Sequence, residues 1–322
     1  MFITKIVAGA LLASCPAHAQ RARGDYRIGY LSITSATNDL RNLEALRAGL
    51  RTLGYIEGQN IAIEARWADG HIENLPRLAA ELVRLPVDIL CTAGTQASGV
   101  AKQATATVPI VFANAAFPVQ TGLVASYPRP GGNITGIAFL DAEYGKRLEL
   151  LKQIYPKLAR VALIYNADNP ASVAAFQETQ RWATALRIGL EPHRFRRLSD
   201  FERVFSAIAA KRPDALMTTA DALIISYRTR LLDFTATHRL LSMYPTREFV
   251  VEGGLMFYGT SIPAMFRQVA VYVDKILKGA KPADLPVEQA AKFEFVLNMK
   301  TAKALGLPIP PSVLLRVDEV VE

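Results

Sequence analysis

One candidate binding element follows the strand-like run Val87–Cys91, where the chain continues through Gly94, Thr95 and Gln96. A glycine permits an irregular backbone, and threonine is a preferred N-cap for the helix that would follow. If Thr95 caps that helix, the N–H groups of Gln96 and Ala97 are free to bind an anion such as a carboxylate. The same residues would also make an ordinary helix start, so both interpretations stay open.

A second candidate is Asp221, which follows the strand-like stretch Met217–Thr219. A carboxylate at this position could bind the ammonium group of a ligand through a charge-assisted hydrogen bond. Aspartate is also a common helix N-cap, and that alternative stays open. The sequence therefore offers one candidate site for an anionic group of a ligand and one for a cationic group.

Further candidate ligand-binding residues are the polar and aromatic residues in the other loops that follow candidate strands. Ligands of open parallel sheets bind beyond the carboxyl ends of the strands, where these loops lie. Phe117 and Tyr258 could stack on an aromatic ligand, although aromatics near loops are more often core residues. Glu248 could pair instead with Arg247 at the surface. The candidate ligand-binding residues are Ser32, Thr34, Thr95, Gln96, Asn114, Phe117, Asp141, Tyr165, Asn166, Asp221, Thr246, Glu248 and Tyr258.

Motifs of catalysis and cofactor binding are absent from the sequence. The chain has no G-x-x-x-x-G-K-[ST], G-x-G-x-x-G or G-x-S-x-G motif, which argues against nucleotide, dinucleotide and α/β-hydrolase chemistry. His71, His193 and His238 are not within helical ligand spacing of one another, and one free cysteine does not favour a zinc site. We therefore expect no catalytic residues, no metal and no cofactor.

The composition is that of a folded globular protein. The 322 residues are 51% hydrophobic and 20% charged, which excludes a disordered tail protein, and their number predicts two domains. The formal net charge is +8, but Lys and Arg are spread along the chain. The densest cluster, Arg194 with Arg196 and Arg197, is expected to form a solvated face, so we expect no nucleic-acid partner.

The elements that must position the candidate residues alternate along the chain. Apolar runs of strand length, starting with Tyr26–Ser32, alternate with amphipathic helical stretches such as Leu40–Leu53. This order is typical of parallel sheets covered by helices on both faces. The series restarts near residues 138–145, which predicts two similarly built lobes. The pattern also predicts a short helix at Val119–Ser126 and one continuous helix at Ala222–Thr237.

The segment 1–19 has the pattern of an export signal peptide. Lys5 precedes an apolar run at residues 6–13 that is too short to span a bilayer, and A-H-A at 17–19 has the form of a cleavage site. The sequence L-A-S-C, ending at Cys15, resembles a lipoprotein box, so lipid anchoring is an alternative to a free exported protein. Cys91 then has no intrachain partner, and its apolar neighbours predict a buried, unreactive thiol.

A series of segments carries a resemblance to a known family. The segments are Leu53–Tyr55, Glu57–Asn60, Gly131–Gly136, Arg147–Lys152, Tyr165–Pro170, Arg247–Gly259, Ala270–Gly279 and Lys281–Pro311. In this order they span essentially the whole mature chain, and the last of them is the most specific. The chain resembles the exported substrate-binding proteins of ABC transporters, in the branch labelled tryptophan/tyrosine transport.

This resemblance implies a type I periplasmic-binding-protein fold, an α/β architecture of two doubly wound parallel-sheet lobes joined by a three-segment hinge. Placed on this chain, the crossing segments fall near residues 138–142, 259–263 and 288–293. Lobe one then comprises residues 25–139 plus 262–289, and lobe two residues 140–260 plus 291–322.

The resemblance also implies a function. A monomeric periplasmic protein of this family would capture a small solute, an aromatic or other amino acid, by closing its lobes, and would deliver it to the permease of an ABC importer. Two alternatives stay open. One is a ligand-sensing module for a membrane receptor, and the other is an exported enzyme on the same fold, for which the sequence nominates no paired base and nucleophile.

Overall fold

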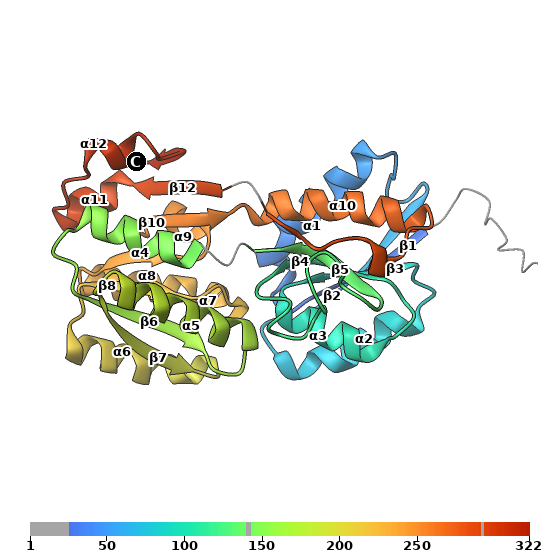
Figure 1. Ribbon diagram of the computed structural model, residues 1–322, viewed down its shortest axis with the longest axis horizontal. Helices are drawn as coiled ribbons and strands as arrows, with labels where there is room; N and C mark the ends of the chain where they lie inside the picture. The colour runs from blue at the N-terminus through green and yellow to red at the C-terminus, as the bar shows by residue number, and fades with distance from the viewer. Residues whose placement is uncertain (1–25, 140–142, 291–292) are drawn as a thin grey trace, which may run out of the picture.

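The computed structural model describes residues 26–139, 143–290 and 293–322, and they form two α/β lobes side by side (Figure 1). The proposed signal segment, including Cys15, lies outside the described residues. No helix within the described residues is long and apolar enough to cross a membrane.

The first lobe is built on a six-stranded sheet in which all neighbouring strands are parallel. Its order is β11 (Glu288–Gln289), β5 (Ile134–Ala138), β4 (Ile110–Ala115), β3 (Ile89–Ala93), β1 (Tyr26–Ser32) and β2 (Ile61–Trp67). Helices α1 (Ala36–Thr52) and α10 (Ile262–Leu277) cover one face, and α2 (Leu75–Arg84) and α3 (Thr95–Ala104) cover the other. The turns η1 (Ile72–Asn74) and η3 (Pro282–Asp284) belong to its connections.

The second lobe is built on a seven-stranded sheet in which only the β10–β12 pair is antiparallel among the described strands. Its order is β13 (Glu319–Val321), β12 (Phe293–Asn298), β10 (Met256–Thr260), β9 (Leu241–Tyr244), β8 (Ala215–Thr218), β6 (Arg160–Asn166) and β7 (Gly189–Phe195).

Helices cover both faces of this sheet as well. On one face lie α4 (Glu143–Ile154), α5 (Pro170–Ala185), α11 (Met299–Leu305) and α12 (Pro311–Leu314). On the other lie α6 (Phe201–Lys211), which follows the turn η2 (Leu198–Asp200), and α7 (Ala222–Ser226), α8 (Arg228–Thr237) and α9 (Arg247–Val251).

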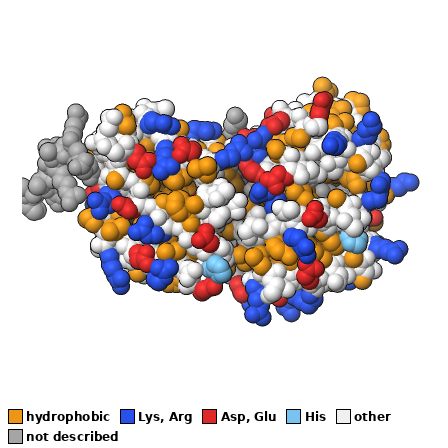
Figure 2. Space-filling view, turned by 180° about the vertical axis from the view of Figure 1, so that it is seen from behind, with side chains coloured by type: hydrophobic (Ala, Val, Ile, Leu, Met, Phe, Trp, Pro, Cys, Tyr) orange, Lys and Arg blue, Asp and Glu red, His pale blue; other side chains and the backbone are white. Residues whose placement is uncertain are grey.

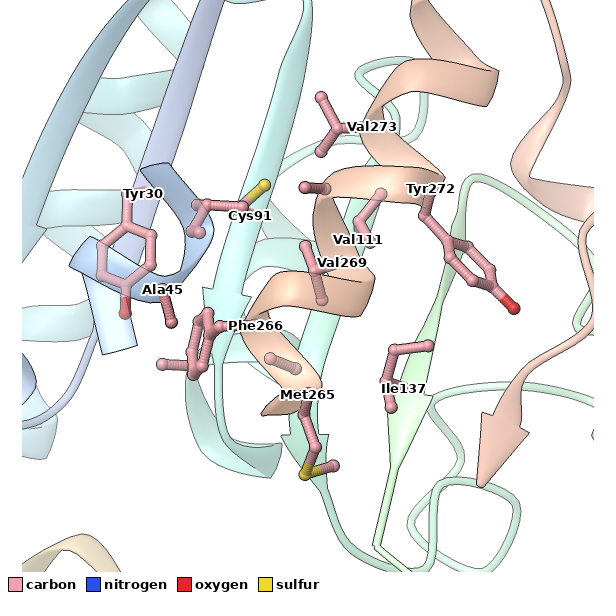
Figure 3. Packing of buried hydrophobic residues seen from close by; sticks show 14 of the residues in the cluster. Tyr30, Ala45, Cys91, Val111, Ile137, Met265, Phe266, Val269, Tyr272 and Val273 are labelled. Carbon is pink, nitrogen blue, oxygen red and sulfur yellow. The ribbon is translucent and has the colours of Figure 1, made fainter. Parts of the chain in front are cut away.

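The chain passes between the lobes three times, after β5, after β10 and after β11 (Figure 1). The predicted fold class is therefore confirmed, whereas the predicted residue bounds of the lobes stay a prediction. The second passage brings α10 back to the first sheet. Figure 3 shows Phe266 and Val269 of α10 lying against the strands that carry Tyr30, Cys91 and Val111.

The thiol of Cys91 lies in this core. Cys91 has no exposed surface and forms no disulfide, as the sequence predicted. Burial away from water raises the pKa of the thiol to about 12, because the charged thiolate is poorly solvated there. At neutral pH the thiol is protonated and unreactive.

A buried ion pair lies next to the second passage. The side chains of Glu143 and Arg147, one helical turn apart on α4, are 0% and 1% exposed. Nη2 of Arg147 donates to Oε1 of Glu143 at 2.9 Å, and Nε donates to the carbonyl of Tyr258 at 2.7 Å. A Cβ atom at Gly259 would come within 2.8 Å of Nη2, so the glycine leaves room for the guanidinium. The pair thus fixes the start of α4 against the end of β10.

Two predicted helices differ in the structure. Residues 119–126 form turns rather than a helix, and Gly122 adopts a left-handed conformation with φ of 72°. The predicted helix 222–237 is divided at Tyr227, whose φ of −98° and ψ of 17° end α7. The ring of Tyr227 packs on that of Phe201 with centroids 4.4 Å apart, a tertiary contact that local periodicity cannot reveal.

Candidate ligand-binding site

A pocket lies between the two lobes, at the carboxyl ends of strands from both sheets. It contains about 750 Å³ of empty space, part of it open to solvent, and we call it the interlobe pocket. Six of the predicted binding residues line it: Ser32, Thr34, Thr95, Gln96, Asn114 and Asp221. The strand-end rule therefore brings together residues that are almost 190 positions apart in the sequence.

Asp221 is the acidic residue that the second lobe contributes to this pocket. It is 3% exposed, and its Oδ1 accepts from the N–H of Leu223 at 2.9 Å, so it caps α7, one of the two roles that the sequence left open. Its Oδ2 accepts from the side-chain amides of Asn166 at 3.1 Å and Asn169 at 2.8 Å. Burial raises the pKa of this carboxyl despite these hydrogen bonds. Within the described residues no Lys, Arg or His forms an ion pair with it.

The N-terminus of α3 lines the same pocket from the first lobe. The prediction that Thr95 caps this helix was wrong, because Gly94 occupies the N-cap position with φ of 85° and Thr95 is the first helical residue. The Oγ1 of Thr95 accepts instead from the N–H of Ala116 at 3.0 Å. The glycine cap has no side chain, and the first turn contains no acidic residue. The positive end of this helix is therefore not neutralised by the helix itself.

Two further polar groups of the first lobe lack partners. The Oγ1 of Thr34 and the Oδ1 of Asn114 are buried and accept or donate no hydrogen bond among the described residues. Asn114 also has a φ of 47°, in the left-handed region that asparagine tolerates better than most residues. Ser32 lies beside them, 1% exposed, and its Oγ is 3.4 Å from the N–H of Thr34. Unpaired groups at a pocket wall are available to a ligand.

The three predicted aromatic residues do not line the interlobe pocket. Phe117 stacks on Tyr144, and Tyr165 on Phe176 with ring centroids 4.8 Å apart. Tyr258 stacks on Phe293 at 5.6 Å. Their rings contact other aromatic rings of the protein.

The other predicted residues lie around the pocket. Asn166 has no exposed surface, and its side-chain amide donates to the carboxylate of Asp221, as described above. Thr246 and Glu248 line an adjoining pocket. Glu248 does not pair with Arg247, which contacts Glu319, but with Arg41 of the first lobe at 3.1 Å. Asp141 lies outside the described residues.

Sequence reasoning missed the polar residues that α1 contributes to the pocket. Asn38, Asp39 and Asn42 line it, because the helix begins at Ala36 rather than at Leu40. Ser35 is its N-cap and accepts from the N–H of Asn38 at 3.3 Å. A serine followed by polar residues three, four and seven positions later was the available signal, since these spacings place side chains on neighbouring parts of one helix surface.

Asp39 organises this part of the wall. It is 1% exposed and accepts from the hydroxyl of Tyr30 at 2.7 Å, the amide of Asn42 at 2.9 Å and the indole N–H of Trp67 at 3.3 Å. These donors satisfy the carboxylate without a cation. Nowhere in the described residues do three or more His, Cys, Asp or Glu side chains form a group that could hold a metal ion.

The family model of ABC transporter substrate binding proteins matches residues 28–321. The chain belongs to this family. The match includes both sheets, apart from the first two residues of β1, and every described residue that lines the interlobe pocket. The substrate-binding protein therefore has its pocket where its two lobes meet, and its family consists of binding proteins.

Individual relatives agree with this assignment. A tyrosine-binding protein of Clostridioides difficile is 25% identical over 259 residues, which are 80% of this chain and 74% of that protein. A solved conserved domain protein of Vibrio cholerae is 26% identical with a TM-score of 0.88, covering 92% of this chain and 99% of the other. A solved ABC domain of Streptococcus pneumoniae in complex with L-Trp has the same fold, with 24% identity, a TM-score of 0.88, and coverage of 92% and 100%.

Proposed function

We propose that this substrate-binding protein captures a zwitterionic α-amino acid in the interlobe pocket, outside the cytoplasm, and delivers it to the permease of an ABC importer. The observation that carries the proposal is the arrangement of charge in the pocket. The buried carboxylate of Asp221 has no cationic partner among the described residues, and the N-terminus of α3, without a side-chain cap, lines the same space.

An α-amino acid supplies both missing charges. Its ammonium group would form charge-assisted hydrogen bonds with Asp221, and its carboxylate would accept from the first N–H groups of α3. The unpaired side-chain oxygens of Thr34 and Asn114 add further polar contacts. Apolar side chains, among them Ile33, Phe139 and Ile262, line the rest of the pocket and would contact the side chain of the solute.

The relatives support this class of solute. The Clostridioides difficile relative is a tyrosine-binding protein, and the structure from Streptococcus pneumoniae contains L-Trp. Delivery would follow from closure of the lobes about the three passages of the chain, because the ligand stabilises the closed state that a permease then contacts. The predicted signal at residues 1–19 is consistent with a protein that works outside the cytoplasm.

The proposal is tested by a melting-temperature screen with L-amino acids, followed by calorimetry. A ligand at about 100 times its Kd should add about 2.7 kcal/mol to the free energy of unfolding. Asp221→Asn should weaken binding at least about tenfold, because a charged hydrogen bond is lost. Asp200→Asn is the matched control, since Asp200 also accepts from backbone N–H groups in the second lobe but does not line the interlobe pocket.

Two results would refute the proposal. One is the absence of any shift or heat with the full set of amino acids at millimolar concentration. The other is an unchanged affinity in Asp221→Asn, which would mean that the ammonium group lies elsewhere.

A further inference from the structure

A second pocket adjoins the interlobe pocket and also lies between the lobes. It contains about 580 Å³ of empty space, part of it open to solvent, and we call it the outer pocket. Four residues line both pockets: Asn38, Asn42, Ile225 and Ile262. Because they share these walls, a ligand bound in the interlobe pocket can extend into the outer pocket.

Two buried hydroxyl groups of the outer pocket have no hydrogen-bond partner. Thr246 is 5% exposed and Thr260 is 3% exposed, and the Oγ1 atom of each is unpaired among the described residues. Thr246 occupies the N-cap position of α9, yet its side chain makes no capping hydrogen bond. An unpaired buried hydroxyl destabilises the folded protein, so a pair of them at one pocket points to a ligand group that would satisfy both.

The charges that line the outer pocket differ from those of the interlobe pocket. Arg41, Arg228 and Arg247 line the outer pocket, and the side chains of Arg228 and Arg247 are only 19% and 22% exposed. In contrast, the described lining of the interlobe pocket contains two aspartates and no Lys, Arg or His.

The arginines keep hydrogen-bonding capacity in spite of their ion pairs. Each guanidinium has five N–H groups, and among the described residues each of these arginines has one acidic partner: Glu248 for Arg41, Glu252 for Arg228 and Glu319 for Arg247. Among the described residues the carboxylates that line the pocket are Glu248 and Glu294, and Glu294 also lines the neighbouring surface hollow, as Arg41 and Arg247 do. Donors therefore outnumber acceptors, as a bound carboxylate requires.

We propose that the outer pocket is a second subsite that binds a carboxylate at the far end of the solute, through the hydroxyls of Thr246 and Thr260 and the free N–H groups of Arg228 and Arg247. This inference rests on the proposed function, because the α-amino group of the solute is placed in the interlobe pocket. The carboxylate can belong to a long amino-acid side chain or to the C-terminus of a dipeptide, and both have the same chemistry at this subsite.

Matched probe pairs test the subsite by calorimetry on the full chain. L-2-aminoadipate against L-norleucine tests a side-chain carboxylate, and L-Ala-L-Ala against its C-terminal amide tests a peptide carboxylate. We expect the acidic member of one pair to bind at least about tenfold more tightly, since hydrogen bonds to charged groups contribute about 1.5–3 kcal/mol. The probe pair whose acidic and neutral members differ in affinity identifies the source of the carboxylate.

Substitutions of the two threonines separate a binding role from a structural one. In Thr246→Val and Thr260→Val the affinity advantage of the acidic probe over the neutral probe should fall at least about fivefold. The melting temperature of the unliganded variants should be unchanged or higher, because the lost hydroxyl had no partner. Thr237→Val, at the exposed end of α8, is the control and should change neither quantity.

The outcomes distinguish this inference from the proposed function. Equal affinity within both probe pairs, or variants that bind the acidic probe as wild type does, would overturn the subsite while amino-acid binding remains established. If no probe and no amino acid binds, the proposed function fails and the subsite fails with it.

Discussion

At the scale of single residues, the pocket is defined by the carboxylate of Asp221, which is removed from water and has no cationic partner in the part of the chain that the structure describes. Asp221 is buried and its hydrogen-bond partners are neutral: two asparagine amides and a backbone N–H. Removal from water raises its pKa, and the hydrogen bonds offset this only in part. A ligand ammonium group would stabilise the charged form, which makes binding at this residue dependent on pH.

The direction of the pH dependence follows from linkage. Since the folded pKa of Asp221 lies above the unfolded value, the folded protein binds the proton more tightly over the interval between them. Stability of the unliganded protein therefore falls as pH rises through that interval and is level above it. Affinity for an ammonium group rises over the same interval, because the ionised carboxylate binds it. The ligand-induced shift in melting temperature should be larger at pH 7 than at pH 4.

Melting curves with and without the best amino acid, recorded from pH 4 to 7, measure this effect. In Asp221→Asn the residual shift should no longer depend on pH in this range. A shift that is as large at pH 4 as at pH 7 in the wild-type protein would show that Asp221 does not bind the ammonium group.

At the scale of elements, the contact between α1 and α10 holds together parts of the first lobe that are more than 200 residues apart. The helices are closely packed at Gly49, where a Cβ atom would lie 2.8 Å from both the Cβ of Ala270 and the carbonyl oxygen of Arg267. The α1 helix also carries Asn38, Asp39 and Asn42 to the pocket. Its position on α10 thus determines where this wall of the pocket lies.

Gly49→Ala should destabilise the protein by about 1–3 kcal/mol, because the added methyl group forces two packed helices apart. Gly99→Ala in α3 is the matched control, since its Cβ atom would meet only Leu123 at 4.0 Å. This substitution should stabilise the protein by about 0.5–1 kcal/mol through the better helix propensity of alanine. Urea denaturation of both variants measures their free energies of unfolding. If both free energies change in the same direction from wild type, the packing argument is contradicted.

At the scale of the whole molecule, the two lobes meet through apolar contacts, such as the stack of Phe117 on Tyr144, and through polar contacts around the pockets. The ion pair between Arg41 of α1 and Glu248 of α9 joins residues of different lobes, at 3.1 Å. Acidic and basic side chains are intermixed over the visible face of both lobes (Figure 2). Since Arg41 and Glu248 are partly exposed, their pair contributes little to stability, but it can form only when the lobes are close.

Glu248→Gln should therefore weaken ligand binding by less than about fivefold, in keeping with the 0.2–1 kcal/mol of an exposed ion pair. It should also reduce the dependence of affinity on salt, because screening no longer acts on this contact. Calorimetric titrations at two salt concentrations, for example about 50 mM and about 500 mM, measure both the affinity and its dependence on salt. Glu57→Gln is the control, since Glu57 pairs with Arg47 within the first lobe and should leave affinity and its salt dependence unchanged.

The sequence by itself determined the features that depend on neighbours along the chain. The alternation of apolar runs and amphipathic stretches predicted the strand Tyr26–Ser32 with the bounds that the structure has. The position of Asp221 directly after a strand indicated helix capping as one of its two possible roles, and the apolar neighbours of Cys91 predicted the burial of its thiol. These are local properties, because hydrogen bonding and periodicity within an element involve residues a few positions apart.

Only the tertiary structure decided which of these residues share a pocket. The return of α10 to the first sheet was implied by the family resemblance and not by periodicity. The partner of Glu248 is 207 positions away, and Gly94 rather than Thr95 caps α3. The unpaired oxygens of Thr246 and Thr260 are visible only once every neighbouring group is placed. The physical reason is that packing and desolvation depend on all atoms nearby in space, whichever part of the chain supplies them.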